Sequence, residues 1–277
     1  MSDEIEVKSL RKNLYEILSN KDIDLRKEYL RIYSFFYISK YYDGYIDATL
    51  ENHINNNFNL LNKKLTHRCI SFADFNDSYG FNFIVQRQNI DIDYLILFAE
   101  YVVNLVYAYS QCASDFINDD LFNIVRHIMD CMDDIGFKTL EKEDLIIFTE
   151  KNPVAISVAE TVGDELSYSV LEYNHHRMKG DLLKKKNILK IMAEDLEPDR
   201  NKLNGINKNL TSDLFQLFNR FIRHNSSKDK FITNMSEEQI EDVYDDIYQM
   251  WLLAKMQLEQ ANRSDKIKKL INDINVK

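Results

Sequence analysis

Apolar residues recur every three or four positions along most of the chain, which is the spacing of one buried helix face. The chain has only 6 Gly and 2 Pro, so few residues interrupt this pattern. The sequence therefore predicts a mainly α protein, a helical bundle. The expected helices cover residues 4–19, 23–41, 45–63, 93–109, 119–136, 165–178, 181–196, 212–225 and 236–258.

Two segments depart from the helical spacing. Residues 67–88 are rich in β-branched and aromatic side chains on both sides of a turn-forming cluster, which favours a β-hairpin. Residues 137–150 show the same arrangement and favour a second small hairpin. We place a domain boundary just before it. This gives an N-terminal helical domain over 1–132 and a C-terminal helical domain over 133–277.

The most apolar run is the 16-residue stretch Tyr94–Tyr109, which contains Glu100 and Asn104. A membrane-spanning helix needs about 20 predominantly apolar residues. We therefore expect a buried core helix here and no membrane partner. The first ten residues are polar and acidic, unlike a signal peptide, which favours a cytoplasmic protein.

The charge and the cysteine content of the chain narrow the classes of function that it can have. The net charge is -10, which argues against a protein that coats nucleic acid with a broad basic face. A small basic site on an acidic body is still compatible with this charge. Cys69, Cys112 and Cys131 have neither metal-ligand spacing nor a CxxC motif, which is typical of reduced thiols.

The most organised polar face belongs to the predicted helix Ser212–Asn225. Its apolar stripe consists of Leu214, Leu217, Phe218, Phe221 and Ile222. Asn219, Arg220, Arg223 and His224 occupy the opposite arc, with Arg220 four residues before His224 and Asn219 four before Arg223. A histidine that titrates near neutral pH thus lies beside two guanidinium groups that can hold a phosphate.

Other charged groups have plainer interpretations. His175 and His176 are adjacent, so they do not share a helix face as an i, i+4 metal pair would, and we expect no metal or other cofactor. They could line the same pocket as His224. The lysines of 184–186 are expected on a solvated face, and Arg126-His127 on the surface.

The C-terminal half resembles the HEPN superfamily of helical bacterial defence and toxin proteins, including abortive-infection-like proteins. The matching stretches are LFQLFNRFIRHN (214–225), EDVYDDIYQMW (241–251) and the segment 171–198, so the resemblance covers about residues 155–260. In that family, an Arg is followed after four to six residues by a His. Here three residues separate Arg220 from His224, and no His follows.

The resemblance implies a metal-independent ribonuclease or toxin of bacterial antiphage defence that works as a homodimer. His224 would act as general acid or base, and Arg220 or Arg223 would stabilise the charge on the reacting phosphate. Asn219, Asn225, His175 and His176 would bind the substrate. The absence of a more distant His favours an alternative, a non-catalytic helical module that binds RNA, a nucleotide or a partner protein.

A third hypothesis is structural: Arg220 and Arg223 would form salt bridges with carboxylates of the last helix, among them Glu241, Asp245 and Asp246. The hypotheses differ in geometry. A nuclease needs a His and a guanidinium group converging on an open cleft, whereas a scaffold would bury and pair the same groups.

Overall fold

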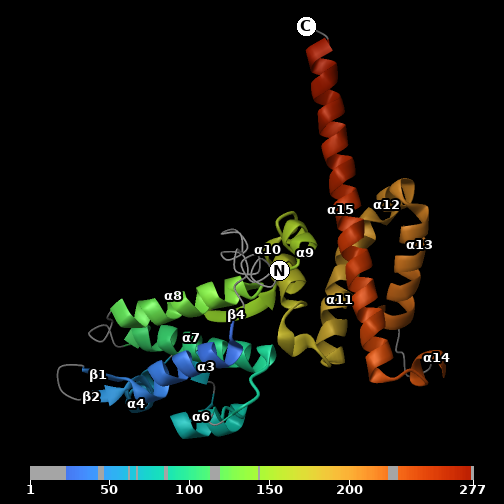
Figure 1. Cartoon of the computed structure of the whole chain (residues 1–277). Coiled ribbons are helices and arrows are strands. Elements are labelled where there is room, and N and C mark those ends of the chain that lie inside the picture. Colours follow the sequence, from blue (N-terminus) through green and yellow to red (C-terminus); the bar gives the residue numbers. More distant parts are fainter. Residues whose placement is uncertain are drawn as a thin grey trace, which may run out of the picture. The chain divides into compact units, whose positions relative to one another are not determined.

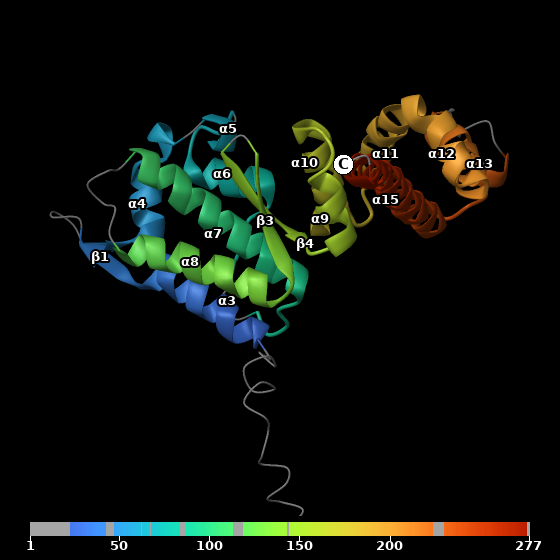
Figure 2. The same cartoon turned by 90° about the horizontal axis from the view of Figure 1, so that it is seen from above.

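In the computed structural model the chain forms two compact units, Met1–Phe148 and Thr149–Lys277 (Figures 1 and 2). The structure describes residues 23–42, 47–61, 63–66, 68–83, 87–112, 119–142, 144–223 and 230–275. The described residues are mainly helical, with two two-stranded sheets, so the predicted fold class is confirmed.

Unit 1 is organised around its longest helix, α7 (Ile92–Cys112), most of which is buried. Aromatic rings pack against it: the centroids of Tyr29 and Phe83 lie 4.9 and 4.5 Å from that of Phe98. The other elements are α3 (Leu25–Tyr33), the π-helical turn η1 (Ser34–Ile38), β1 (Lys40–Tyr42), β2 (Asp47–Thr49), α4 (Leu50–Asn56), η2 (Phe58–Leu60), α5 (Lys63–Thr66), α6 (Phe72–Tyr79), α8 (Asp119–Asp134), β3 (Phe137–Lys142) and β4 (Leu145–Glu150).

Helix α7 is long and apolar enough to cross a membrane by length and composition alone, but 67% of its most apolar window is buried inside the structure. Two polar residues in the middle of this helix, Glu100 and Asn104, bind the backbone of β4.

The predicted hairpin at 67–88 is wrong, because much of that segment is helix α6. Ser71 caps it: the Ser71 hydroxyl oxygen accepts a hydrogen bond from the backbone N–H of Asp74 at 3.1 Å. Gly80 ends it with a φ of 68°, the left-handed conformation that glycine adopts most readily. These two end signals outweigh the β propensity of the aromatic residues.

The first sheet lies elsewhere, in residues predicted to be helical. Strands β1 and β2 pair antiparallel, with Lys40 opposite Thr49 and Tyr42 opposite Asp47, so the predicted helices 23–41 and 45–63 are each shortened. The second sheet, β3 with β4, confirms the hairpin at 137–150. The predicted helix 4–19 lies outside the described residues.

The two units divide at Phe148/Thr149, within β4, whereas the sequence placed the boundary at 132/133. Most of the hairpin therefore belongs to unit 1. The physical reason is that side chains of α7 hold the β4 backbone at Ile146 and Phe148.

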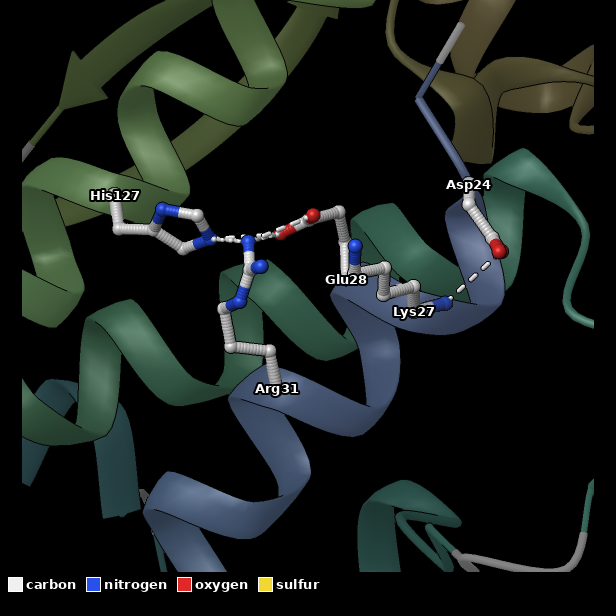
Figure 3. A network of polar contacts seen from close by, with 5 residues as sticks. All are labelled: Asp24, Lys27, Glu28, Arg31 and His127. Atoms are coloured by element: carbon white, nitrogen blue, oxygen red, sulfur yellow. Dashed lines mark hydrogen bonds and ion pairs between the residues drawn. The ribbon is translucent and has the colours of Figure 1, made fainter.

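The sequence suggested that His127 on α8 is surface decoration. The structure shows instead that this histidine contacts a residue of another helix. Its Nε2 lies 2.7 Å from Glu28 Oε2 on α3, and Arg31 Nη1 donates to both oxygens of Glu28 at 2.8 Å (Figure 3). Asp24 caps the same helix by accepting a hydrogen bond from the backbone N–H of Lys27 at 3.0 Å. The Glu28 carboxylate therefore joins α3 to α8.

Unit 2 consists of helices, with the 39-residue α15 (Glu237–Asn275) running alongside α11, α12 and α13 (Figure 1). Its other elements are α9 (Pro153–Ala159), α10 (Asp164–Glu172), η4 (His176–Met178), α11 (Leu182–Leu196), η5 (Glu197–Asp199), α12 (Arg200–Ile206), α13 (Lys208–Leu217), the π-helical turn η6 (Phe218–Arg223) and α14 (Lys230–Thr233).

Capping residues define several helix starts in unit 2. The predicted capping box is confirmed: Ser236 Oγ accepts from Gln239 N at 3.2 Å, and Gln239 Oε1 accepts from Ser236 N at 2.9 Å. Asp181 caps α11 as predicted, since its Oδ1 accepts from Lys184 N at 3.0 Å. The starts of α11 and α15 were thus readable from sequence.

Candidate functional site

The predicted helix 212–225 begins earlier in the structure and changes form within the motif. Helix α13 starts at Lys208, where Asn207 Oδ1 accepts from Leu210 N at 3.1 Å, and it gives way to the π-helical turn η6 at Phe218. π-Helical turns often occur at functional sites. His224 and Asn225 lie outside the described residues, so their predicted roles stay predictions.

The apolar face of this segment is buried, as the sequence predicted. Leu214, Phe218, Phe221 and Ile222 are almost fully enclosed and Phe215 joins them, whereas Leu217, also predicted for this face, is only half-buried. The segment is therefore anchored through one face, and this fixes which side chains point away from the core.

Two predicted site residues, Asn219 and Arg220, line one surface pocket of about 420 Å³. The pocket is completed by Arg200 at the start of α12 and by Ser212, Phe215 and Gln216 of α13. Its wall thus combines two guanidinium groups with hydroxyl and amide groups. These are hydrogen-bonding side chains of the kind that hold an oxyanion.

Arg200 is the pocket residue that the sequence interpretation missed. Its Cζ lies 4.5 Å from the centroid of the Phe215 ring, and its Nη1 donates to Glu197 Oε1 at 3.4 Å. The ring and the carboxylate together restrict the guanidinium plane. Arg200 is twenty residues from Arg220, and no spacing rule connects residues brought together by two different helices.

Arg223 belongs to a different environment, because it binds the end of α11. Its Nη2 donates to Ala193 O at 3.1 Å and pairs with Glu197, while its Nη1 donates to Asn219 Oδ1 at 3.2 Å. The side chain is 27% exposed and does not line the pocket. The structure therefore gives Arg223 an anchoring role and leaves Arg220 as the pocket arginine of the motif.

Two of the three carboxylates predicted to pair with these arginines, Glu241 and Asp245, bind another cation. Glu241 and Asp245 of α15 bind Lys185 Nζ at 2.8 and 2.6 Å, and Lys185 is only 5% exposed. The expected solvated face at 184–186 is thus wrong for Lys185. The expected partners of Arg223 are also wrong, since its salt bridge is with Glu197.

The Lys185 cluster is a structural network. Tyr173 donates its hydroxyl to Asp245 at 2.8 Å and stacks on Tyr248 with ring centroids 4.1 Å apart. Burial, together with the charge of Asp245, raises the pKa of Tyr173 above its ordinary value, so its hydroxyl stays a donor. Burial tends to raise the pKa of Glu241, but hydrogen bonds from Lys185 and from the Gly180 N–H outweigh it and lower that pKa.

His175 and His176 do not line the pocket of Asn219 and Arg220. They precede α11, whereas Glu197 and Arg200 follow it, and a helix of this length separates its ends by about 22 Å. His175 is buried, and its Nδ1 accepts from the backbone N–H of Arg177 at 3.2 Å. The substrate-binding role predicted for these two histidines in a site with Arg220 is therefore not supported by their placement.

Comparison with descriptions of protein families, with curated proteins and with solved structures finds no match to this chain. The fold and the pocket define a mainly helical protein with a local cationic site in its second unit. The resemblance to HEPN proteins stays a prediction from the residues that carry it.

Proposed function

We propose that the protein binds RNA through the phosphate groups that the Arg200–Arg220 pocket accepts. One observation supports this most directly: two arginines from different helices line one pocket together with Ser212, Gln216 and Asn219. Phosphate oxygens take hydrogen bonds from guanidinium, hydroxyl and amide donors alike.

The electrostatics of the pocket suit a local contact. Glu197 lies close to Arg200 and Arg223 and partly neutralises that pair, while Arg220 adds positive charge at the pocket wall. The body as a whole carries a net charge of -10. Such a protein would repel the backbone of a long nucleic acid except where it meets this site. This charge distribution fits the binding of a short single-stranded segment better than the coating of a long nucleic acid.

Metal-independent cleavage of that RNA, as in an abortive-infection toxin, is the stronger form of the proposal. It rests on His224, which directly follows the π-helical turn in sequence. In this scheme Arg220 stabilises the developing charge on phosphate, and His224 transfers the proton. The non-catalytic binding module differs from it only in lacking that proton transfer.

The binding proposal is tested by fluorescence anisotropy with a short fluorescein-labelled single-stranded RNA and the full chain. We expect Arg200→Gln and Arg220→Gln each to weaken binding about tenfold at low salt. Each should also lower the slope of log affinity against log salt by about one. Lys184→Gln is the matched control, because it removes one exposed positive charge at the other end of α11.

Equal losses in all three variants, or none in any, would overturn the pocket assignment. Incubation of the same RNA in EDTA with wild-type protein and His224→Ala then separates the two forms of the proposal. Cleavage that disappears in the variant supports a ribonuclease. Binding without cleavage in either protein supports the non-catalytic module.

A further inference from the structure

The last helix continues well beyond the part of unit 2 that it packs against (Figure 1). Lys202 of α12 contacts Asn262, and the described side chains that follow along α15 are largely exposed. Among these are four large apolar residues that are 50 to 63% exposed: Ile267, Leu270, Ile271 and Ile274. A row of isoleucine and leucine in water is costly, so this surface requires an explanation.

Three of these residues, Ile267, Leu270 and Ile274, extend a regular stripe that begins earlier on the same helix. Alternating steps of three and four residues connect Leu253, Met256, Gln260, Arg263, Ile267, Leu270 and Ile274. This is the a/d spacing of a coiled coil, sustained over three heptads. Trp251, Ala254 and Leu258 are buried within unit 2, and all seven stripe positions are exposed, so the stripe lies on the other side of the helix.

We propose that this stripe pairs with the same stripe of a second copy of the chain, in an antiparallel coiled coil. In the register that matches its chemistry, Leu253 packs on Leu270 of the second copy and Met256 packs on Ile267. At the centre, Gln260 meets Arg263, and its amide oxygen can accept a hydrogen bond from the guanidinium group. The apolar residues from Leu253 to Leu270 therefore meet apolar residues, and the polar pair Gln260 and Arg263 meets its own symmetry-related copy, while Ile274 lies beyond this stretch, opposite Gln249.

The flanking charges favour the same arrangement. In this register Glu259 of one copy lies beside the seam and opposite Lys266 of the other copy. The two-fold symmetry of the dimer repeats this pair. A parallel pair would instead place Arg263 against Arg263 of the second copy and leave Lys266 facing Ile271. Charge complementarity thus selects the antiparallel alignment.

Unit 2 also has a groove next to the stripe, where side chains of the second helix can lie. Beside the stripe, Ser157 and Val158 of α9 and Thr161, which follows that helix, form a groove of about 270 Å³ with Met256 and its neighbours on α15. In the antiparallel register the end of the second copy's α15 runs along this part of the helix. The stretch from Leu253 to Leu270, over which the stripes pair, is about 27 Å long.

The first test measures the self-association of the full chain by sedimentation equilibrium. We expect a wild-type dimer and, for the double variant Ile267→Glu/Leu270→Glu, a dissociation constant raised at least about tenfold. The matched control, Lys268→Gln/Asn272→Glu, changes the charge equally on the opposite face and should stay dimeric. Circular dichroism checks that helix content is kept. A monomeric wild type, or a dimer indifferent to Ile267→Glu/Leu270→Glu, would overturn the proposal.

The second test addresses the alignment. Glu259→Lys and Lys266→Glu should each weaken the dimer about threefold or more, because each places like charges across the seam. Combining the two substitutions in one chain restores both opposite-charge pairs and should recover the wild-type constant. If the double variant weakens the dimer by as much as the two single substitutions do together, the antiparallel register is excluded.

Discussion

The side-chain amide of Asn104 pairs with the backbone of Ile146 as a neighbouring β-strand would. Its Nδ2 donates to Ile146 O at 2.7 Å, and its Oδ1 accepts from Ile146 N at 2.8 Å. One turn earlier, Glu100 accepts from the Phe148 N–H at 2.8 Å. Helix α7 thus satisfies backbone groups along β4, which has β3 as its partner in a two-stranded sheet.

Replacing Asn104 with Leu should release β4 from α7. Both polar groups of Ile146, a residue that is 5% exposed, would lose their partners, at a cost of about 2–4 kcal/mol. Hydrogen exchange followed by mass spectrometry should show faster exchange in the peptide that covers β4. Gln111→Leu, at an exposed position of the same helix, is the control. Unchanged exchange at β4 in Asn104→Leu would contradict the role of this pair.

The sequence indicated Glu100 and Asn104 as unusual within an apolar helix, but it could not indicate what they bind. Periodicity reports which face of an element is buried, and it identified the buried residues of α15 up to Leu258, but the predicted helix 236–258 was too short, because α15 continues to Asn275. It does not report which element covers that face. The same limit explains Lys185, whose burial depends on carboxylates of α15, one of them, Asp245, sixty positions away.

Short elements were the least predictable part of the fold. For the segment containing Phe72 and Phe75, β propensity favoured a strand, but the cap at Ser71 and the glycine at 80 decide for a helix. In the candidate site, local spacing identified Asn219 and Arg220 correctly as neighbours on one surface. It could not identify Arg200, which tertiary packing against Phe215 brings to the same pocket.

The two motif arginines should separate into different roles when mutated. Arg223→Gln removes the pairing with Glu197 and the hydrogen bond to Ala193 O, and should lower the free energy of unfolding of unit 2 by about 1–3 kcal/mol. Arg220→Gln alters an exposed side chain and should change stability by less than about 0.5 kcal/mol. Urea unfolding followed by fluorescence of Trp251, the single tryptophan, measures both. Equal destabilisation by the two variants would contradict this division of roles.

Lys185 should be important for the stability of unit 2 although it belongs to a run of three lysines. Lys185→Met keeps much of the side-chain volume but leaves Glu241 and Asp245 without their cation, at a cost of about 2 kcal/mol. Lys184→Met, at an exposed neighbour, should fall within about 0.5 kcal/mol of wild type. The urea midpoint reported by Trp251 fluorescence compares them. A Lys185→Met variant as stable as Lys184→Met would show that the buried network contributes nothing.

The same network predicts how unit 2 responds to acid. The pKa of Glu241 is lowered in the folded protein, because hydrogen bonds from Lys185 and the Gly180 N–H outweigh the effect of burial. A carboxyl group with a lowered folded pKa binds protons more weakly folded than unfolded. The contribution of the Glu241 carboxylate to the stability of unit 2 is therefore complete above the pKa of about 4.3 that a glutamate has in the unfolded chain. It is lost as the pH falls through the pKa of the folded state.

We accordingly expect the stability of wild-type unit 2 to decline as the pH is lowered from about 5 to 3, measured by urea unfolding at each pH. Lys185→Met lacks the main cation that lowers this pKa, so its decline should be shallower and the difference between the two proteins should shrink towards low pH. Lys190→Met, at another exposed lysine of α11, should follow the wild-type curve. A difference between wild type and Lys185→Met that stays constant over this range would mean that Glu241 does not gain its stabilisation from Lys185.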